Sequence, residues 1–302
     1  MNYLNPFFTK GLIEFGEILD KKKCDEIYNK IVNSRNLSKN IFRSKKEYFK
    51  NSNPRKTNPG KGFNNLTEKF DLSFVENHPT IKKNLGLLLG KDYETVMKNF
   101  VIGVPENWMP KWVKETTKKQ LAPNLGAYIK NEYRDVTYFR GIDFHMDLID
   151  HPKLVGHNLT LYIYLNQVNN KMSPLKIIEK SHILGATKFP HYIKNDRKNS
   201  IEYSSDNKKF KKFKKKTIIG DRGNVYLWSS FILHGTNPQQ SDNPRISLRY
   251  DFKPSNKSKI KNIYINKFLK KIKGKLSMQI VRDDINLNSK KMEQLKFDKI
   301  LK

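Results

Sequence analysis

One pair of side chains and a distant histidine have the types and spacing to bind a metal ion. Of the seven histidines, only His145 has an acid two positions later, which is Asp147. On a β-strand, residues i and i+2 point to the same side, so both side chains can reach one ion. One carboxylate and two imidazoles, the second from His234, form the 2-His-1-carboxylate face of non-haem Fe(II) enzymes. The spacing of His145 and Asp147 therefore permits an Fe(II) site, in which a distant histidine, with His234 as the candidate, supplies the second imidazole.

The His-x-Asp pair by itself carries little weight. A chain of 302 residues with seven histidines and 29 acidic residues is expected to contain such a pair by chance. Asp143 also lies two residues from His145, so these two residues form an alternative ligand pair. The surroundings of His234 favour a site, because it ends an apolar strand candidate at 231–234 and precedes a Gly-Thr turn.

Two arginines downstream could bind a carboxylate. Arg245 begins a strand candidate eleven residues after His234 and could hold a distal carboxylate through two hydrogen bonds. The alternative for Arg245 is an ion pair with Asp251 or with an acid of the C-terminal tail. Arg249 shares a face with Arg245 and could hold an acidic substrate or replace Arg245. Substrate contacts could also come from upstream residues, but most of the aromatic ones are expected to be core and most of the basic ones solvated. These residues are Trp108, Trp112, Tyr128, Lys130, Tyr138 and Arg140.

Short strands between about residues 124 and 252 must position these side chains. Residues 159–165 alternate apolar and polar, which predicts a half-buried strand, and residues 245–252 alternate in the same way. Residues 175–178 and 225–228 are further candidates. Short strands behind an N-terminal helical part predict a mainly β protein with flanking helices. We expect its core to be a double-stranded β-helix, of the jelly-roll or cupin-like kind.

The N-terminal part has helical periodicity. Apolar residues at helical spacing in residues 22–33 predict a helix with one buried stripe, and Asp20 is its expected N-cap. A second helix is expected from near Thr80 to Gly90, whereas residues 34–65 are expected to be a long loop and residues 101–123 irregular. The expected organisation is one domain over residues 1–255, helical to residue 123, and a basic helical tail over residues 256–302.

The stretch from about 140 to 252 resembles the phytanoyl-CoA dioxygenase-like branch of the Fe(II)/2-oxoglutarate oxygenases. Residues 8–31 are similar to the opening strand and helix of that family. The resemblance depends on the order and spacing of four segments: His145-Met146-Asp147, Leu175 to His182 with Gly185, Gly220-Asp221, and His234-Gly235-Thr236 followed by Arg245.

The resemblance implies a set of cofactors and roles. It implies Fe(II), 2-oxoglutarate and O₂, with His145, Asp147 and His234 as iron ligands and catalytic residues. Arg245 would bind the distal carboxylate of 2-oxoglutarate, and the hydroxyl of Thr236 would contact the same carboxylate. The implied reaction hydroxylates, or otherwise oxidises, a C–H bond of a small organic substrate and releases succinate and CO₂. An aspartate at 147, rather than a small residue, favours hydroxylation over halogenation.

Two departures from the family change turns near the site. The family has Pro-Gly before the Ser-His pair, where this chain has Glu179-Lys180. It has a glycine near 173, where this chain has Ser173-Pro174.

The net charge of +30 has two interpretations. One is a polyanionic partner. The other is composition alone, because lysine, asparagine and isoleucine are all abundant and lysine exceeds arginine. Seven lysines and two phenylalanines fill residues 208–216, which we expect to be a solvated loop. The tail at 253–302 has 15 Lys/Arg against 4 Asp/Glu and an apolar stripe, which predicts an amphipathic helix packed on the domain.

The charge leaves an alternative function open. It is a non-enzymatic basic protein on the same fold that docks on nucleic acid or on an anionic membrane surface. Against this, the residue pattern of the site favours an enzyme with a small-molecule substrate, including an anionic one.

Several other classes are disfavoured. No apolar run approaches the roughly 18 residues that span a bilayer, and the N-terminus lacks a secretory pattern. The single cysteine, Cys24, permits neither an intrachain disulfide nor a cysteine zinc cluster, and it lies on the buried stripe of its helix. A P-loop, a Gly-x-Gly-x-x-Gly motif and a Gly-x-Ser-x-Gly motif are absent from the sequence. These features predict a cytoplasmic protein.

Overall fold

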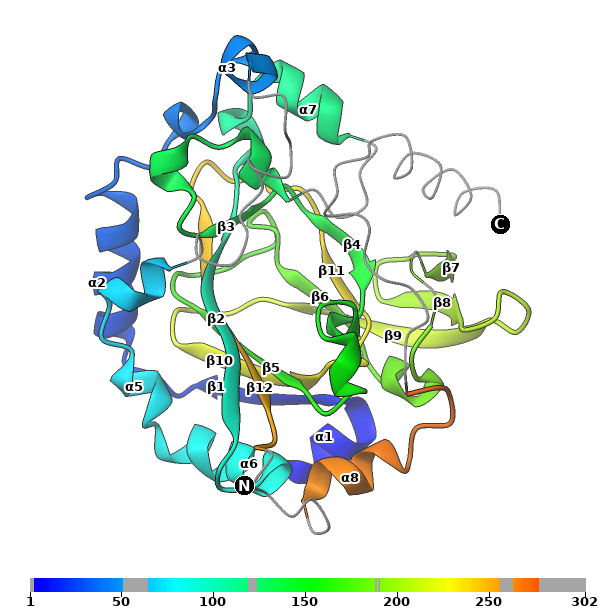
Figure 1. The fold of residues 1–302 in the computed structure, drawn as a ribbon. Helices are drawn as coiled ribbons and strands as arrows, with labels where there is room; N and C mark the ends of the chain where they lie inside the picture. The colour runs from blue at the N-terminus through cyan, green and yellow to red at the C-terminus, as the bar shows by residue number, and fades with distance from the viewer. Residues whose placement is uncertain are drawn as a thin grey trace.

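Two curled β-sheets form the centre of the protein (Figure 1). The computed structural model describes residues 3–50, 65–118, 124–187, 189, 191–255 and 263–276. Its pairing is antiparallel except between β2 and β3. The first sheet has the order β1 (Leu12–Glu17), β10 (Asn224–Ser229), β5 (Leu159–Tyr164), β12 (Arg245–Lys253), β2 (Glu94–Gly103) and β3 (Thr137–Phe139). The second sheet has the order β4 (Ile142–His145), β11 (His234–Thr236), β6 (Leu175–Ile178), β9 (Lys211–Ile218), β8 (Ser200–Ser204) and β7 (Tyr192–Lys194).

This arrangement confirms the predicted mainly β fold with a jelly-roll core. Neighbours in each sheet are mostly distant in sequence, as β1 beside β10 shows, so the sheets close only when the whole chain is folded. β1 and α2 match the opening strand and helix that the resemblance implies for residues 8–31, whereas β2 is an unexpected strand in the part that was predicted to be helical. The division into one domain and a basic tail stays a prediction.

The central strands of the first sheet are buried on both faces. Every residue of β5 is buried, so the predicted half-buried strand is wrong in this respect. The reason is tertiary: helices cover the outer face of the sheet, while the inner face lies inside the barrel (Figure 1). In β12 the apolar face of Ile246 and Leu248 points to the helices, and the polar face of Arg245 and Arg249 points inward.

Helices surround the sheets (Figure 1). They are α1 (Leu4–Lys10), α2 (Lys21–Val32), α3 (Lys45–Lys50), α5 (Ser73–Glu76), α6 (Pro79–Leu89), α7 (Lys111–Thr117) and α8 (Tyr264–Leu269). The predicted N-cap is confirmed, since Asp20 accepts hydrogen bonds from the amides of Lys22 and Lys23. Burial raises the pKa of Cys24 in α2 to about 12, which fits a structural thiol. The predicted second helix is confirmed as α6.

Two predicted loops contain helices. Residues 34–50 include α3, where Ser44 and Glu47 form a reciprocal capping box: the Ser44 amide donates to Glu47 and the Glu47 amide donates to Ser44 Oγ. Residues 51–64 lie outside the described residues. Residues 101–118 are not irregular, because they contain the end of β2 and the whole of α7.

The lysine-rich segment at 208–216 is not a loop, because most of it forms β9. Pairing with β6 and β8 fixes it in the second sheet. Acidic side chains from elsewhere in the chain offset part of its charge, in the ion pairs Lys214–Glu179, Lys215–Asp196 and Lys216–Glu14. Long-range pairing thus makes a strand of a segment whose local composition predicts a solvated loop.

The described part of the tail packs as expected. Ile265, Phe268 and Leu269 of α8 are buried, and Phe268 lies 4.6 Å, between ring centroids, from Phe7 of α1. Residues 277–302 lie outside the described residues. Among the helices that the structure describes, none is long and apolar enough to cross a membrane.

Candidate active site

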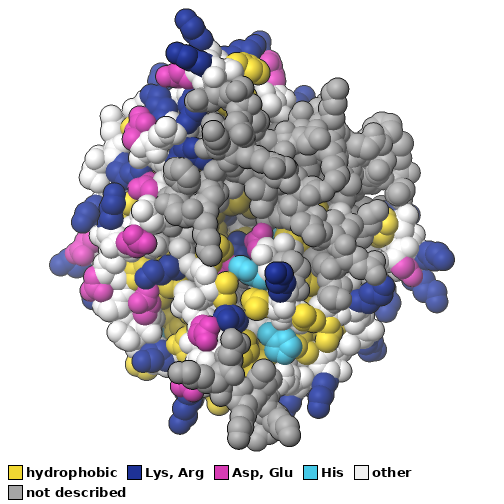
Figure 2. Space-filling model, viewed as in Figure 1, with side chains coloured by type: hydrophobic (Ala, Val, Ile, Leu, Met, Phe, Trp, Pro, Cys, Tyr) yellow, Lys and Arg dark blue, Asp and Glu magenta, His cyan; other side chains and the backbone are white. Residues whose placement is uncertain are grey.

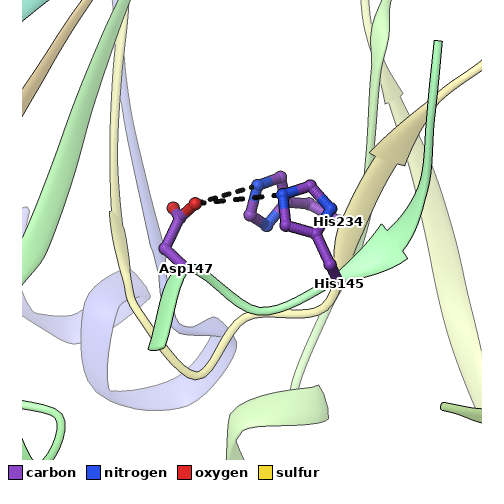
Figure 3. Close-up of side chains that lie close together, drawn as sticks. All are labelled: His145, Asp147 and His234. Carbon is purple, nitrogen blue, oxygen red and sulfur yellow. Dashed lines mark ion pairs between the residues drawn. The ribbon is translucent and has the colours of Figure 1, made fainter. Parts of the chain in front are cut away.

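The three predicted metal ligands meet at the inner side of the barrel. His145 ends β4 and His234 begins β11, and the two are direct register partners across these neighbouring strands. Asp147 follows β4, at the start of the short 3-10 helix η6 (Asp147–Ile149). One ligand atom from each residue lies within 4.8 Å of the others, and all three residues are buried. Figure 3 shows both imidazoles directed at the Asp147 carboxylate.

Backbone carbonyls orient both imidazoles. His145 Nδ1 lies 3.0 Å from Asp143 O, and His234 Nδ1 lies 3.0 Å from Ile232 O. A carbonyl only accepts hydrogen bonds, so each Nδ1 carries the proton and each Nε2 keeps its lone pair. The Nε2 atoms lie 4.0 Å and 3.5 Å from Asp147 Oδ1 for His145 and His234 respectively. This tautomer and orientation are those of metal-ligating histidines.

The Asp147 carboxylate is fixed at its other oxygen. Trp228 Nε1 donates to Oδ2 at 2.8 Å, and Thr160 Oγ1 donates to it at 2.7 Å. Oδ1 therefore faces the two histidines. Burial opposes the charged form, but Arg249, and then His234 and His145, hold the pKa of Asp147 well below its ordinary value. The carboxylate is thus ionised, as a metal ligand must be.

The same cavity contains the residues expected to bind 2-oxoglutarate. Its walls are Val101, Phe139, Ile142, His145, Asp147, Tyr162, Leu175, Trp228, His234, Gly235, Thr236, Arg245 and Arg249. Arg245 is buried, its Nη1 donates to Ser173 O, and its Nε has no hydrogen-bond partner among the described residues. A buried guanidinium with an unused donor fits a carboxylate ligand. Thr236 Oγ1 already accepts from the Ile142 amide at 3.1 Å, and its hydroxyl hydrogen remains to be donated.

These features fit a divalent metal with a carboxylate co-substrate. The metal-facing atoms are two imidazole nitrogens and one carboxylate oxygen, the donor set of non-haem Fe(II) sites. Gly235 allows the close approach of β11 and β4, since a Cβ there would lie 2.8 Å from Ile142 O. The glycine that follows His234 is therefore required by the pairing of the two ligand-bearing strands.

The structure decides between the alternatives that the sequence leaves open. Asp143 is not in the group of converging ligand atoms, and its Oδ1 accepts from the Phe144 amide. Asp251 pairs with Arg249 rather than with Arg245. The acids of the C-terminal tail lie outside the described residues, so a pair between one of them and Arg245 stays an untested alternative. His234 begins β11, so the predicted strand at 231–234 is wrong.

The upstream residues lie away from the cavity. Tyr128 and Tyr138 are buried in the core, Trp112 packs against Tyr128, and Arg140 is paired with Glu106. The three aromatic residues fit the core interpretation, whereas Arg140 is partly buried in an ion pair rather than on a solvated face.

Sequence reasoning missed several residues that hold the ligands. Trp228 and Thr160 fix Asp147, and Ser181 Oγ accepts from the Leu233 amide at 2.8 Å, next to His234. Ser181 belongs to the motif on which the family resemblance depends. Trp228 and Thr160 gave no local signal, because the packing of β10 and β5 of the first sheet against the segment after β4 of the second brings them to Asp147.

Comparison with solved structures places the fold among known proteins. One match is the epimerase SnoN in complex with Fe³⁺, alpha ketoglutarate and nogalamycin RO, with 13% identity and a TM-score of 0.51. Another is the non-heme alpha ketoglutarate dependent epimerase SnoN from nogalamycin biosynthesis, with 11% identity and a TM-score of 0.52. Each match covers 83% of this chain and 82% of that chain. At such identities the likeness shows a shared fold.

Comparisons at the level of sequence add nothing further. A scan against protein families and a search of curated proteins both find no match.

Proposed function

We propose that this chain is an Fe(II)- and 2-oxoglutarate-dependent dioxygenase. It oxidises a C–H bond of a small organic substrate and releases succinate and CO₂. The observation that carries the proposal is the buried convergence of His145 Nε2, His234 Nε2 and Asp147 Oδ1 in one cavity with Arg245. The resemblance to the phytanoyl-CoA dioxygenase-like family and the fold shared with SnoN support it.

Each residue has a part in this function. His145, Asp147 and His234 would hold the iron through two imidazole nitrogens and one carboxylate oxygen. When bound, iron supplies the redox chemistry that activates O₂ at the expense of 2-oxoglutarate. Arg245 binds the distal carboxylate of 2-oxoglutarate through its guanidinium, and Thr236 donates its hydroxyl hydrogen to the same carboxylate. The apolar walls, including Phe139 and Ile142, exclude water from the reacting centre.

The residues of the site specify the metal and the co-substrate more closely than they specify the product of the reaction. SnoN is an epimerase on the same fold, so the fold itself does not select hydroxylation. An aspartate at position 147 keeps the third protein ligand, which supports hydroxylation over halogenation.

The test compares two neighbouring carboxylates. With Fe(II), 2-oxoglutarate and O₂, we expect the chain to form succinate, and we expect Asp147→Ala to lose essentially all of it together with Mn²⁺ binding. Asp143→Ala is the matched control, because Asp143 lies as close in sequence to His145 but outside the ligand group. Retained Mn²⁺ binding in Asp147→Ala would overturn the assigned metal site.

Arg245 is tested separately from the metal. Arg245→Met should leave Mn²⁺ affinity close to that of the wild type and weaken 2-oxoglutarate binding at least about 100-fold, because a buried charge-assisted pair is lost. Calorimetric titration of the Mn²⁺-loaded protein with 2-oxoglutarate measures this. Unchanged 2-oxoglutarate affinity would remove Arg245 from the site.

A further inference from the structure

A buried cluster of charges adjoins the metal-binding triad. Arg249 lies at its centre on the inward face of β12. Its Nη2 is 3.0 Å from Asp147 Oδ1 and 3.0 Å from Asp251 Oδ2, and its Nε is 3.1 Å from Asp251 Oδ1. Asp150 Oδ2 lies 3.4 Å from the same Nη2. One guanidinium therefore serves three carboxylates, and two of these, Asp147 and Asp251, are almost completely inaccessible to solvent.

The contact between Arg249 and Asp147 uses the oxygen that faces the metal position. Oδ2 of Asp147 is occupied by Trp228 and Thr160, whereas Oδ1 faces the two histidines. Arg249 donates to Oδ1. Arg249 therefore places a positive charge at the oxygen that faces the proposed metal position.

Without that charge the site would be costly to keep folded. A buried carboxylate that lacks a compensating cation is strongly destabilising. Thr160 lies between the two carboxylates, 2.7 Å from Asp147 Oδ2 and 3.0 Å from Asp251 Oδ1, but its hydroxyl has one hydrogen for two acceptors. His151 Nε2 lies 2.9 Å from Asp251 Oδ2 and so also contacts Asp251. Among the described residues, Arg249 is the cation that contacts both Asp147 and Asp251.

We propose that Arg249 is the resident counter-cation of this site: it supplies at Asp147 Oδ1 the positive charge that a divalent metal supplies when it binds. The inference rests on the proposed metal site. Asp251 and Asp150 give Arg249 partners to retain when Oδ1 turns to the metal. The exchange keeps the metal-free site assembled and lowers metal affinity, because the ion competes with a guanidinium for the same oxygen. This assigns Arg249 to the metal site rather than to an acidic substrate, since its charge is already offset.

The test measures Mn²⁺ binding without co-substrate or turnover. In Arg249→Lys the shorter side chain keeps its charge beside Asp251 and gives up the contact with Asp147 Oδ1. We expect Mn²⁺ to bind roughly tenfold more tightly to this variant than to the wild type, because a competing cation leaves the ligand oxygen. Without added metal, Arg249→Met should have a lower melting temperature than the wild type. Addition of Mn²⁺ should increase the melting temperature of this variant by more than it increases that of the wild type.

Arg140→Lys is the matched control. Arg140 is also a partly buried arginine held by a carboxylate, Glu106, but it is not part of the cavity wall. Its Mn²⁺ affinity should equal that of the wild type.

The outcomes separate this inference from the proposed function. Equal or weaker Mn²⁺ binding in Arg249→Lys, with normal binding in the wild type, overturns the counter-cation and leaves the metal site standing. Absence of Mn²⁺ binding in the wild type overturns both. If Arg249→Met does not fold, the Mn²⁺ affinity of Arg249→Lys alone tests the role of Arg249 as counter-cation.

Discussion

Individual residues near the site hold backbone conformations that usually belong to glycine. Lys180 has φ 68° and Ser173 has φ 52°, and these are the positions where the resembling family has glycine. Left-handed backbone costs an L-residue about 1 kcal/mol or more. Hydrogen bonds to distant parts of the chain retain it here: the Lys180 amide donates to Lys10 O at 3.0 Å, and Ser173 O accepts from Arg245. Both departures therefore keep the turn geometry without the residue that adopts it most easily.

A glycine variant at Lys180 measures how much the left-handed backbone there costs in stability. We expect Lys180→Gly to raise the free energy of unfolding by about 0.5–1 kcal/mol, because glycine adopts a positive φ without the steric penalty. Urea unfolding measures it. Lys180→Ala removes the same exposed side chain but keeps the Cβ, so it should be close to neutral. A glycine variant no more stable than the alanine variant would contradict the strain.

At the scale of elements, a histidine lies at the junction of α1, α8 and η8 (Ser181–Leu184). The His182 ring is stacked on Phe268 of α8, with ring centroids 5.1 Å apart, and its Nδ1 has no hydrogen-bond partner among the described residues. Burial lowers the pKa of His182 to about 4, from 6.5. The docking of α8 therefore requires a neutral imidazole.

This burial makes stability depend on pH. The folded pKa is lower than the unfolded one, so the unfolded state takes up the proton first as pH falls. The contribution of His182 is complete above pH 6.5 and is lost progressively down to about pH 4. By pH 4 the loss amounts to about 3 kcal/mol in the free energy of unfolding.

A His182→Gln variant isolates the contribution of His182 to the pH dependence of stability. His182→Gln should show a free energy of unfolding that falls less between pH 7 and pH 4 than that of the wild type. Urea unfolding at several pH values measures both slopes. Identical slopes would show that His182 does not titrate in this window.

At the scale of the whole molecule, positive charge gathers on one extension of the second sheet. Strands β7, β8 and β9 lie at the right of Figure 1, and Figure 2 shows Lys and Arg side chains along that edge. The exposed lysines of this basic arm are Lys194, Lys198, Lys208, Lys209, Lys211, Lys212 and Lys214. A cluster of this kind attracts polyanions through counterion release, with a steep dependence on salt.

The basic arm and the metal site should be separable. We expect a variant with Lys208, Lys209, Lys211, Lys212 and Lys214 replaced by glutamine to leave heparin resin at lower salt than the wild type. Its succinate formation should be unchanged, because none of these lysines lines the cavity. A loss of succinate formation in this variant would instead connect the arm to the substrate, and unchanged retention would exclude the arm as the polyanion-binding surface.

The sequence by itself predicted several local elements and the residues that meet at the candidate site. Alternation predicted β5 and β12, helical spacing with Asp20 predicted α2, and residue types predicted that His145, Asp147 and His234 belong together. These features are encoded within a few residues of each other, or in residue types whose chemistry allows few uses.

Only the tertiary structure decided which partners these residues have. It selected Asp147 over Asp143, because the turn into η6 directs Asp147 at both histidines. It placed β5 between the helices and the interior of the barrel, so that both faces of this strand are buried. It also stabilised lysine-rich β9 as a strand through distant partners such as Glu14, which pairs with Lys216 from 202 residues away. It also brought Arg249 into hydrogen-bond contact with Asp147, which lies 102 residues away in the sequence. Such contacts depend on the closure of two sheets, which local sequence does not encode.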